Sequence, residues 1–180
     1  MGRGRTLPNL YPQNPMPNWH ALRVSTHRSG CSDRFTALAA KLGITPYVVA
    51  EESMTPALKP GDGLLTVRLR HPGRGRLVVL EHPERAGLIL VKRIIGLPGE
   101  TVTIEAGRLL VDGEAIPEPW ARGHAGADGR WHVDDTSIFV VSDARELTRA
   151  DSRRFGPLPI RGSRRVIRVV RGALPPEATG

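Results

Sequence analysis

Short apolar runs, most of them flanked by glycine or proline, are the feature that most restricts the fold of this chain. Runs of this length are too short for helices that bury an apolar stripe, and their β-branched and leucine residues suit a pleated surface. They span residues 64–69, 77–80, 88–91, 101–104, 108–111, 137–141 and 166–170. The pattern predicts an all-β domain of Greek-key type, in which residues 101–136 form a hairpin-rich insert.

The N-terminal part of the chain has a different character. Residues 1–31 are rich in arginine and carry prolines at positions 8, 12, 15 and 17, which predicts a disordered basic extension. Residues 32–46 predict a short helix and a linker, because apolar residues recur at helical spacing from Phe35 to Leu42. This apolar stripe fits packing on the domain or contact with a membrane surface. The β domain is then expected to span residues 47–180.

The net charge and hydropathy of the chain limit the classes of partner that it is expected to bind. Its net charge of +8, from 26 Lys and Arg against 18 Asp and Glu, suits an anionic membrane surface or nucleic acid. We expect no nucleic-acid partner, because no helix-turn-helix or zinc-finger pattern is present and aromatic residues make up 4% of the chain. No apolar run reaches the length of about 18 residues that a membrane span needs. The first 30 residues lack the apolar core of a secretory signal. The sequence therefore predicts a protein that is soluble in the cytoplasm or peripheral at the membrane.

No cofactor and no metal ion is expected. Cys31 is the single cysteine, which excludes an intrachain disulfide. His124, Asp128 and His132 are ligand types, but glycines surround them and no rigid element fixes their geometry. We interpret this stretch as a solvated loop.

Ser53 and Lys92 are the residues with the clearest catalytic potential. Ser53 begins the run Ser-Met-Thr-Pro, and Lys92 lies 39 residues later at the start of Lys-Arg-Ile-Ile-Gly-Leu-Pro-Gly-Glu. A serine hydroxyl is a poor nucleophile until a neighbouring base takes its proton, and a neutral lysine amine can do so. Because a free lysine has a pKa of about 10.4, burial has to lower it by about 2–3 units. The apolar residues around Lys92 favour such burial, and strand alternation sends Lys92 and Arg93 to opposite faces.

Together with a third run, Asp151-Ser152-Arg153, these motifs resemble the type I signal peptidase family over roughly residues 47–171. The resemblance implies a β domain of the signal peptidase and LexA type, with a serine–lysine dyad that cuts extended peptides after small residues. It also implies that Met54 lines the substrate cleft, although a packing role for this residue is equally compatible with the sequence. Arg93, Asp151 and Arg153 resemble the ion cluster that shapes the wall beside the lysine in this family.

The sequence departs from the family's pattern near the expected site. Residues 142–145 read Ser-Asp-Ala-Arg where the family has Gly-Asp-Asn-Arg. Arg149 stands where the family has a serine, so Thr148 is the residue predicted to take that place and hydrogen-bond the lysine amine.

The predicted oxyanion site departs as well. Glu51 stands two residues before the nucleophile, where some members carry a serine that stabilises the oxyanion. The backbone N–H of Ser53 is therefore the predicted oxyanion donor. We expect Glu51 and Glu52 to point to solvent, because inward carboxylates would oppose the oxyanion and raise the pKa of Lys92.

The leading hypothesis is a serine endopeptidase that cleaves signal-peptide-like or precursor peptides with the Ser53–Lys92 dyad. The missing membrane span favours a soluble maturation protease for one dedicated partner, such as those for nickel superoxide dismutase. A pilin peptidase of the conjugation type and a self-cleaving repressor of the LexA type are related alternatives, although no DNA-binding helix pair precedes the β domain. A different class is an inactive homologue that binds peptides or membrane proteins in its cleft.

Overall fold

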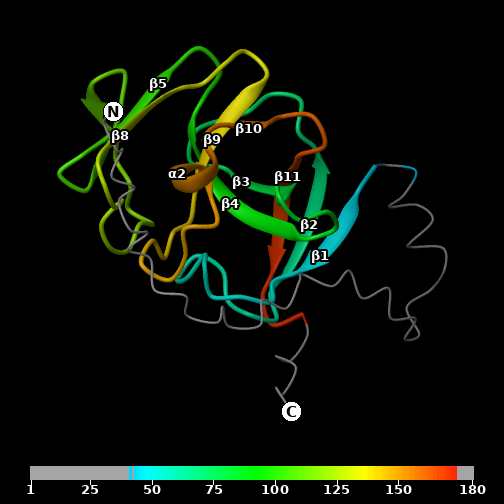
Figure 1. The fold of residues 1–180 in the computed structure, drawn as a ribbon. Coiled ribbons are helices and arrows are strands. Elements are labelled where there is room, and N and C mark those ends of the chain that lie inside the picture. Colours follow the sequence, from blue (N-terminus) through cyan, green and yellow to red (C-terminus); the bar gives the residue numbers. More distant parts are fainter. Residues whose placement is uncertain (1–40, 42, 174–180) are drawn as a thin grey trace, which may run out of the picture.

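The computed structural model describes Lys41 and residues 43–173, and these residues form an almost entirely β structure (Figure 1). The predicted extension at 1–31 and most of the predicted helix and linker at 32–46 lie outside the described residues. Thr45 and Pro46, expected in the linker, belong to the first strand.

The main sheet has seven strands in the order β1-β2-β11-β3-β4-β9-β10, and all neighbours pair antiparallel. Its strand β11 lies between β2 and β3, so the sheet is not a simple meander. The strands are β1 (Thr45–Val48), β2 (Gly63–Arg68), β3 (Leu77–Glu81), β4 (Ile89–Gly96), β9 (Ser137–Val141), β10 (Leu158–Pro159) and β11 (Arg164–Val170). The prediction of an all-β fold is confirmed.

A second sheet is built from the chain between β4 and β9. Its strands are β5 (Thr101–Glu105), β6 (Arg108–Val111), β7 (Glu114–Ala115) and β8 (Gly129–His132), in the order β7-β6-β5-β8. The chain leaves the main sheet after β4 and returns as β9, which pairs with β4. A short helix, α2 (Ser152–Phe155), lies between β9 and β10 (Figure 1).

The two sheets meet at the end of β4. A Cβ atom on Gly96 would lie 2.5 Å from Val102 Cγ2 and 2.9 Å from Phe139 Cβ, so only glycine permits this approach. One apolar cluster then joins both sheets, with Ile95 and Val141 from the main sheet and residues of β5 and β6 from the second.

Two further clusters cover the main sheet. Leu80, Leu90 and Ile94 belong to one, and Val79 and Val91, which alternate with them along the strands, belong to the other. Lys92 lies between Leu90 and Ile94 on the same face of β4, at a position where the pattern calls for an apolar residue.

Candidate active site

Ser53 lies in the loop between β1 and β2. The residue after it, Met54, has no exposed surface and packs in the cluster with Leu58 and Val79. The backbone N–H of Ala144 donates to the carbonyl oxygen of Ser53 at 3.1 Å, which ties this loop to the segment after β9. These contacts hold the Ser53 side chain, in a residue that is 8% exposed, at the edge of a pocket.

Met54 was expected to line the substrate cleft, and this role stays a prediction. Its side chain is fully buried and does not contribute to the pocket beside Ser53. An apolar side chain next to the serine gains more free energy in the core than on the cleft surface. Met54 thus anchors the Ser53 loop to the core.

Lys92 reaches Ser53 from β4. Its Nζ atom is hydrogen-bonded to Ser53 Oγ at 3.2 Å, and the residue is 2% exposed. None of the ion pairs within residues 43–173 involves Lys92. The two residues singled out from the sequence are therefore in direct contact, and the lysine is buried without a carboxylate in contact.

Burial lowers the pKa of Lys92 from 10.5 to about 8. The negative charges of Asp151 and Glu51 raise this pKa, and the positive charge of Arg153 lowers it again. Desolvation is the largest of these effects, because a charged amine loses its hydration in the apolar cluster. With such a pKa roughly one amine in ten is neutral at pH 7, against about one in 2,500 for a free lysine.

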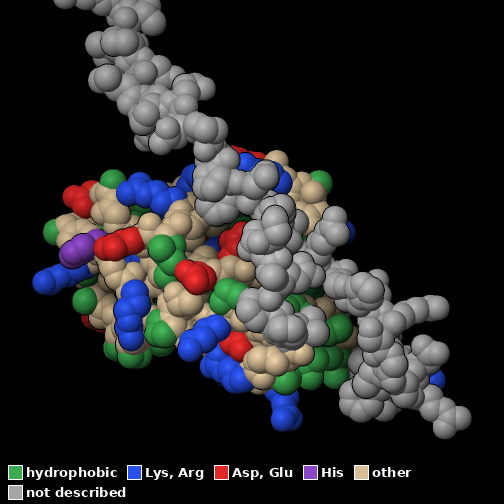
Figure 2. Space-filling view, turned by 90° about the horizontal axis from the view of Figure 1, so that it is seen from below, with side chains coloured by type: hydrophobic (Ala, Val, Ile, Leu, Met, Phe, Trp, Pro, Cys, Tyr) green, Lys and Arg blue, Asp and Glu red, His purple; other side chains and the backbone are tan. Residues whose placement is uncertain are grey.

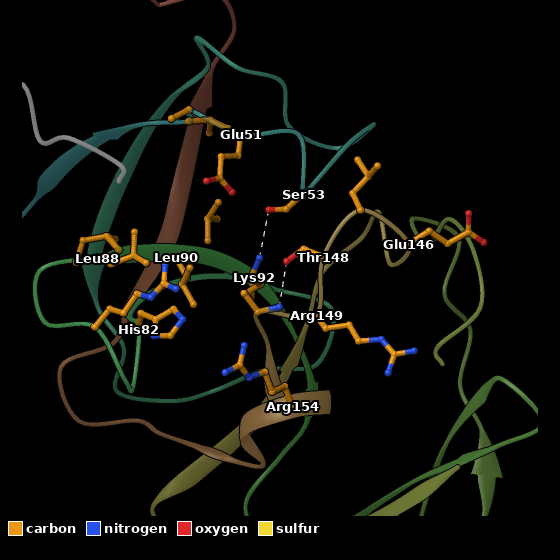
Figure 3. A pocket seen from close by; sticks show the side chains of 17 residues that line it. Glu51, Ser53, His82, Leu88, Leu90, Lys92, Glu146, Thr148, Arg149 and Arg154 are labelled. Atoms are coloured by element: carbon orange, nitrogen blue, oxygen red, sulfur yellow. Dashed lines mark hydrogen bonds between the residues drawn. The ribbon is translucent and has the colours of Figure 1, made fainter. Parts of the chain in front are cut away.

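Glu51 does not point away from the site as the sequence analysis expected. It is exposed, but its side chain forms part of the pocket wall, and its carboxylate points into the pocket near Ser53 (Figure 3). Its charge acts on Lys92 and raises the pKa of the amine. Glu52 is also exposed and does not line the pocket, so for Glu52 the expectation holds. The difference follows from the bend of the chain at residues 51 and 52, just before the turn closed by the Thr55 N–H and the Glu52 carbonyl oxygen, which sends the two neighbouring side chains in different directions.

Thr148 lies on the opposite wall of the pocket. Its hydroxyl accepts a hydrogen bond from the backbone N–H of Ala150 at 3.0 Å (Figure 3). The hydrogen bonds found within residues 43–173 include none between Thr148 and Lys92. The role of Thr148 in orienting the lysine stays a prediction.

Arg93 lies on the other face of β4 and is fully paired. Its Nε and Nη2 atoms donate to the two carboxylate oxygens of Asp143 at 2.7 and 2.5 Å, and Nη1 donates to Gly75 O at 2.6 Å. The guanidinium also lies 4.5 Å from the centre of the Trp120 ring. The partner of Arg93 in the predicted ion cluster is thus Asp143, which the sequence analysis had not included.

Asp151 and Arg153 make a separate ion pair at the start of α2. Asp151 Oδ2 accepts from Arg153 Nη2 at 2.9 Å and from the backbone N–H of Ser142 at 3.0 Å, while Oδ1 caps the helix through the Arg153 N–H. Burial alone would raise the pKa of Asp151, but the hydrogen bonds and charge of Arg153 hold it below its usual value. An ionised Asp151 thus ties α2 to the segment after β9.

The pocket, of about 360 Å³, lies between the Ser53 loop, the start of β4 and residues 146–150 (Figure 3). Leu88 and Leu90 form an apolar wall on the same face of the chain as Lys92. His82 closes the pocket below them, and burial lowers the pKa of its imidazole. Sequence reasoning missed His82, because a histidine before a proline is typical of a strand end. The charged residues Arg85, Glu146, Arg149 and Arg154 also line the pocket.

Within the described residues, no group of three or more His, Cys, Asp and Glu side chains could hold a metal ion. His124 and Asp128 lie in the insert, where Asp128 accepts a hydrogen bond from the backbone N–H of Ala106 at 3.0 Å. No helix in the part of the chain that the structure describes is both long and apolar enough to cross a membrane.

Comparison with known proteins identifies the family. The family described as signal peptidase, peptidase S26, matches residues 34–167, a range that contains Ser53, Lys92 and the whole pocket. The chain belongs to this family. Its members are serine endopeptidases, so the predicted enzyme class is confirmed.

Several relatives are named signal peptidase I. The chain is 33% identical over 131 residues to signal peptidase I V of Bacillus subtilis, which covers 62% of the chain and 76% of that protein. It is 32% identical to signal peptidase I of Leptolyngbya laminosa (66% of each chain) and 35% identical to that of Bacillus amyloliquefaciens (61% of each). The chain thus spans less than two thirds of the length of the latter two. A crystal structure of a signal peptidase I from Enterococcus faecalis aligns with a TM-score of 0.48 and 24% identity, covering 56% of this chain and 99% of that one.

Proposed function

We propose that the chain is a serine endopeptidase in which Ser53 is the nucleophile and Lys92 is the general base, and that it cleaves signal-peptide-like or precursor peptides after small residues. The observation that carries the proposal is the 3.2 Å contact between Lys92 Nζ and Ser53 Oγ, made by a lysine that is 2% exposed. A buried amine in contact with a hydroxyl, and with no carboxylate in contact, is suited to take the proton of that hydroxyl.

The reaction follows from this geometry. The neutral amine of Lys92 accepts the proton of Ser53, and Oγ attacks the carbonyl carbon of the scissile peptide bond. The resulting ammonium gives the proton to the leaving amine, and an ester on Ser53 remains. Lys92 then accepts a proton from a water molecule, which attacks the ester. The product acid leaves as the ammonium of Lys92 returns this proton to Ser53 Oγ.

The oxyanion needs a donor in this scheme, and the backbone N–H of Ser53 is our candidate. Among the hydrogen bonds of residues 43–173, none has this N–H as donor, so it is free to bind the developing negative charge. Glu51 opposes the same charge from the pocket wall. We therefore expect a slower enzyme than the dyad alone would permit.

The shape and charge of the pocket bear on the substrate. Leu88 and Leu90 offer an apolar wall of limited size, which suits small side chains such as alanine one and three places before the cut. An extended peptide would bind there by adding a strand. The charged residues at Arg85, Arg149 and Arg154 add selection by charge, which fits a protease with a dedicated partner better than a general one.

The test is cleavage of a reporter peptide with alanine at these two places, measured from pH 6 to 10. Wild type is expected to cut, while Ser53→Ala and Lys92→Ala fall to background. Lys59→Ala is the matched control, because Lys59 is exposed and does not line the pocket. Equal cutting by wild type and Ser53→Ala would refute the proposal.

One alternative has its own supporting observation. The Glu51 carboxylate in the pocket wall disfavours both the neutral lysine and the oxyanion, which fits a homologue that binds peptides without cutting them. If the folded wild type is silent across the whole pH range but binds the reporter, this alternative replaces the enzyme.

We also propose that basic residues make a peripheral contact with anionic lipid. Arg68, Arg70, His71 and Arg165 line a depression at the end of β2 and the start of β11. On the face seen in Figure 2, by contrast, Lys and Arg side chains are interspersed with Asp and Glu. Sedimentation with vesicles of anionic or neutral lipid tests the contact, which predicts binding to the anionic vesicles that weakens in Arg68→Ser and Arg70→Ser. Equal sedimentation of wild type with both vesicles would contradict it.

A further inference from the structure

Ser142 lies opposite Lys92 in the pairing of β4 with β9. Arg93 is paired with Val141 and Ile94 with Val140, so the antiparallel register, continued by one residue, places Ser142 across from Lys92. Side chains of directly opposite residues lie on the same face, with Cβ atoms about 4.5–5.5 Å apart. The next residue, Asp143, contacts Arg93 on the other face, as this alternation requires.

Both side chains of this pair have unused hydrogen-bonding capacity within the described residues. Ser142 is 1% exposed, and its Oγ atom has no partner within the described residues. Lys92 Nζ has one, Ser53 Oγ. Buried polar groups without partners cost free energy, and an amine that becomes an ammonium during the reaction needs acceptors for its N–H groups. A hydroxyl is such an acceptor.

The backbone of Ser142 is fixed while its side chain is free to turn. Its N–H donates to Asp151 Oδ2 at 3.0 Å, and Asp151 is itself held by Arg153. Rotation about the Cα–Cβ bond of Ser142 therefore moves Oγ without disturbing the strand.

We propose that the Ser142 hydroxyl positions Lys92 by accepting a hydrogen bond from Nζ, so that the lone pair of the neutral amine faces the Ser53 hydroxyl. The inference rests on the proposed function and adds a positioning residue to it. The proton passes from Ser53 Oγ to Lys92 Nζ, and Ser142 keeps its own proton throughout. The same bond holds the ammonium until the leaving amine takes the proton.

Thr148 is less suited to this task than Ser142. Its hydroxyl already accepts the N–H of Ala150, and Thr148 lies in a loop that lines the open pocket. Ser142 is buried, unpartnered within the described residues and fixed in register with the lysine.

Other charged groups also act on Lys92 and have to stay unchanged in a test. They come from α2 and its N-cap, from the segment after β9 and from the Ser53 loop, and they are Asp151, Arg153, Asp143 and Glu51. The charge of Lys92 in turn lowers the pKa of His82, which follows β3. Replacing Ser142 by alanine changes none of these charges and leaves the backbone bond to Asp151 in place.

The experiment compares Ser142→Ala with Thr148→Val and Ser152→Ala in the reporter assay, with kcat and KM measured from pH 6 to 10. Ser152 is the structural control, because its buried hydroxyl accepts the backbone N–H of Val140 at 2.9 Å and lies outside the pocket. Thermal melts check that each variant is folded. We expect Ser142→Ala to lower kcat by roughly 10- to 100-fold at unchanged KM. The acid limb of its kcat–pH profile should move to lower pH, because the ammonium of Lys92 loses a hydrogen-bond acceptor and its pKa falls.

Several results would overturn the inference. One is a folded Ser142→Ala with a kcat within about twofold of wild type, and another is a fall in kcat without movement of the acid limb, which a structural role predicts. A larger fall with such movement in Thr148→Val assigns the task to Thr148. The proposed function fails separately, when Ser53→Ala cuts as well as wild type.

Discussion

The two faces of β4 carry neighbouring buried basic residues, and these differ in how their charges are paired. Lys92 lies between Leu90 and Ile94, hydrogen-bonded only to a hydroxyl within the described residues. Arg93 is 8% exposed, yet it donates to both oxygens of Asp143 and to a carbonyl, and lies over Trp120. Burial is common to both, but only the arginine has its charge matched.

This difference is the one expected between the proposed catalytic base and a structural ion. A matched buried charge stays ionised and holds two segments together, whereas an unmatched buried amine is destabilised in its charged form and becomes a proton acceptor near neutral pH. The choice of residue type agrees, because lysine shifts its pKa readily and arginine does not.

The largest effect is expected on activity. Lys92→Met should lower kcat/KM on the reporter by about 10⁴-fold or more, since the proposed general base is lost while the shape of the side chain is kept. Arg93→Met, measured in parallel under conditions where it is folded, should lose far less. An equal loss of kcat/KM in the two folded variants would contradict a difference in role between Lys92 and Arg93.

The second prediction concerns stability on the Arg93 face. Arg93→Met leaves the Asp143 carboxylate, whose side chain is 1% exposed, without its partner. Breaking a buried pair in this way costs about 3–5 kcal/mol of unfolding free energy. Urea unfolding measures it, and a loss below about 1 kcal/mol would show that the pair contributes no more than a surface one.

On the Lys92 face, replacement by methionine is expected to raise the free energy of unfolding, whereas on the Arg93 face it lowers it. Lys92 has a pKa of about 8 in the folded state against 10.5 for a freely solvated lysine, so below pH 8 its charge disfavours folding. Lys92→Met should therefore be more stable than wild type at pH 7, by roughly 3 kcal/mol if the whole shift of pKa is expressed.

The pH dependence of this gain follows from proton linkage. Between the two pKa values the unfolded chain binds more protons than the folded one, so wild-type stability rises with pH from about 8 to about 10.4, and the advantage of Lys92→Met shrinks. Melting temperatures from pH 6 to 10 check this. A destabilised Lys92→Met at pH 7 would contradict it.

The smallest effect is expected at the pocket wall. Glu51 raises the pKa of Lys92, so Glu51→Gln should lower that pKa and move the acid limb of kcat/KM to lower pH. Because Glu51 is exposed, the gain at pH 7 should stay below about tenfold. Glu52→Gln is the matched control, and a shift of the same size in both variants would mean that general surface charge is responsible.

Much of the fold could be read from the sequence because strand formation here follows local composition. The runs at 77–80 and 137–141 correspond closely to β3 and β9. Strand β8 was missed, since Gly-Arg-Trp-His has no apolar alternation and its place is set by pairing with β5. The same holds for β10, whose two residues pair with β9.

In the site, local motifs singled out the two residues of the proposed dyad but not their surroundings. Ser53 and Lys92 stand in long recognisable runs, and alternation correctly separates Lys92 from Arg93. The contact between Arg93 and Asp143 depends on the register of β4 with β9, which no local pattern fixes. The direction of the Glu51 side chain likewise depends on the turn geometry around Ser53.

The most direct test of the central claim is the pKa of Lys92 itself, measured by NMR titration of the lysine ε-carbons. The chain has lysine only at positions 41, 59 and 92, so the signals can be assigned with Lys92→Met and Lys59→Ala. We predict one signal that titrates with a pKa of about 8 and is absent in Lys92→Met. Three signals with ordinary values near 10.4 would contradict the claim that Lys92 is the base for Ser53.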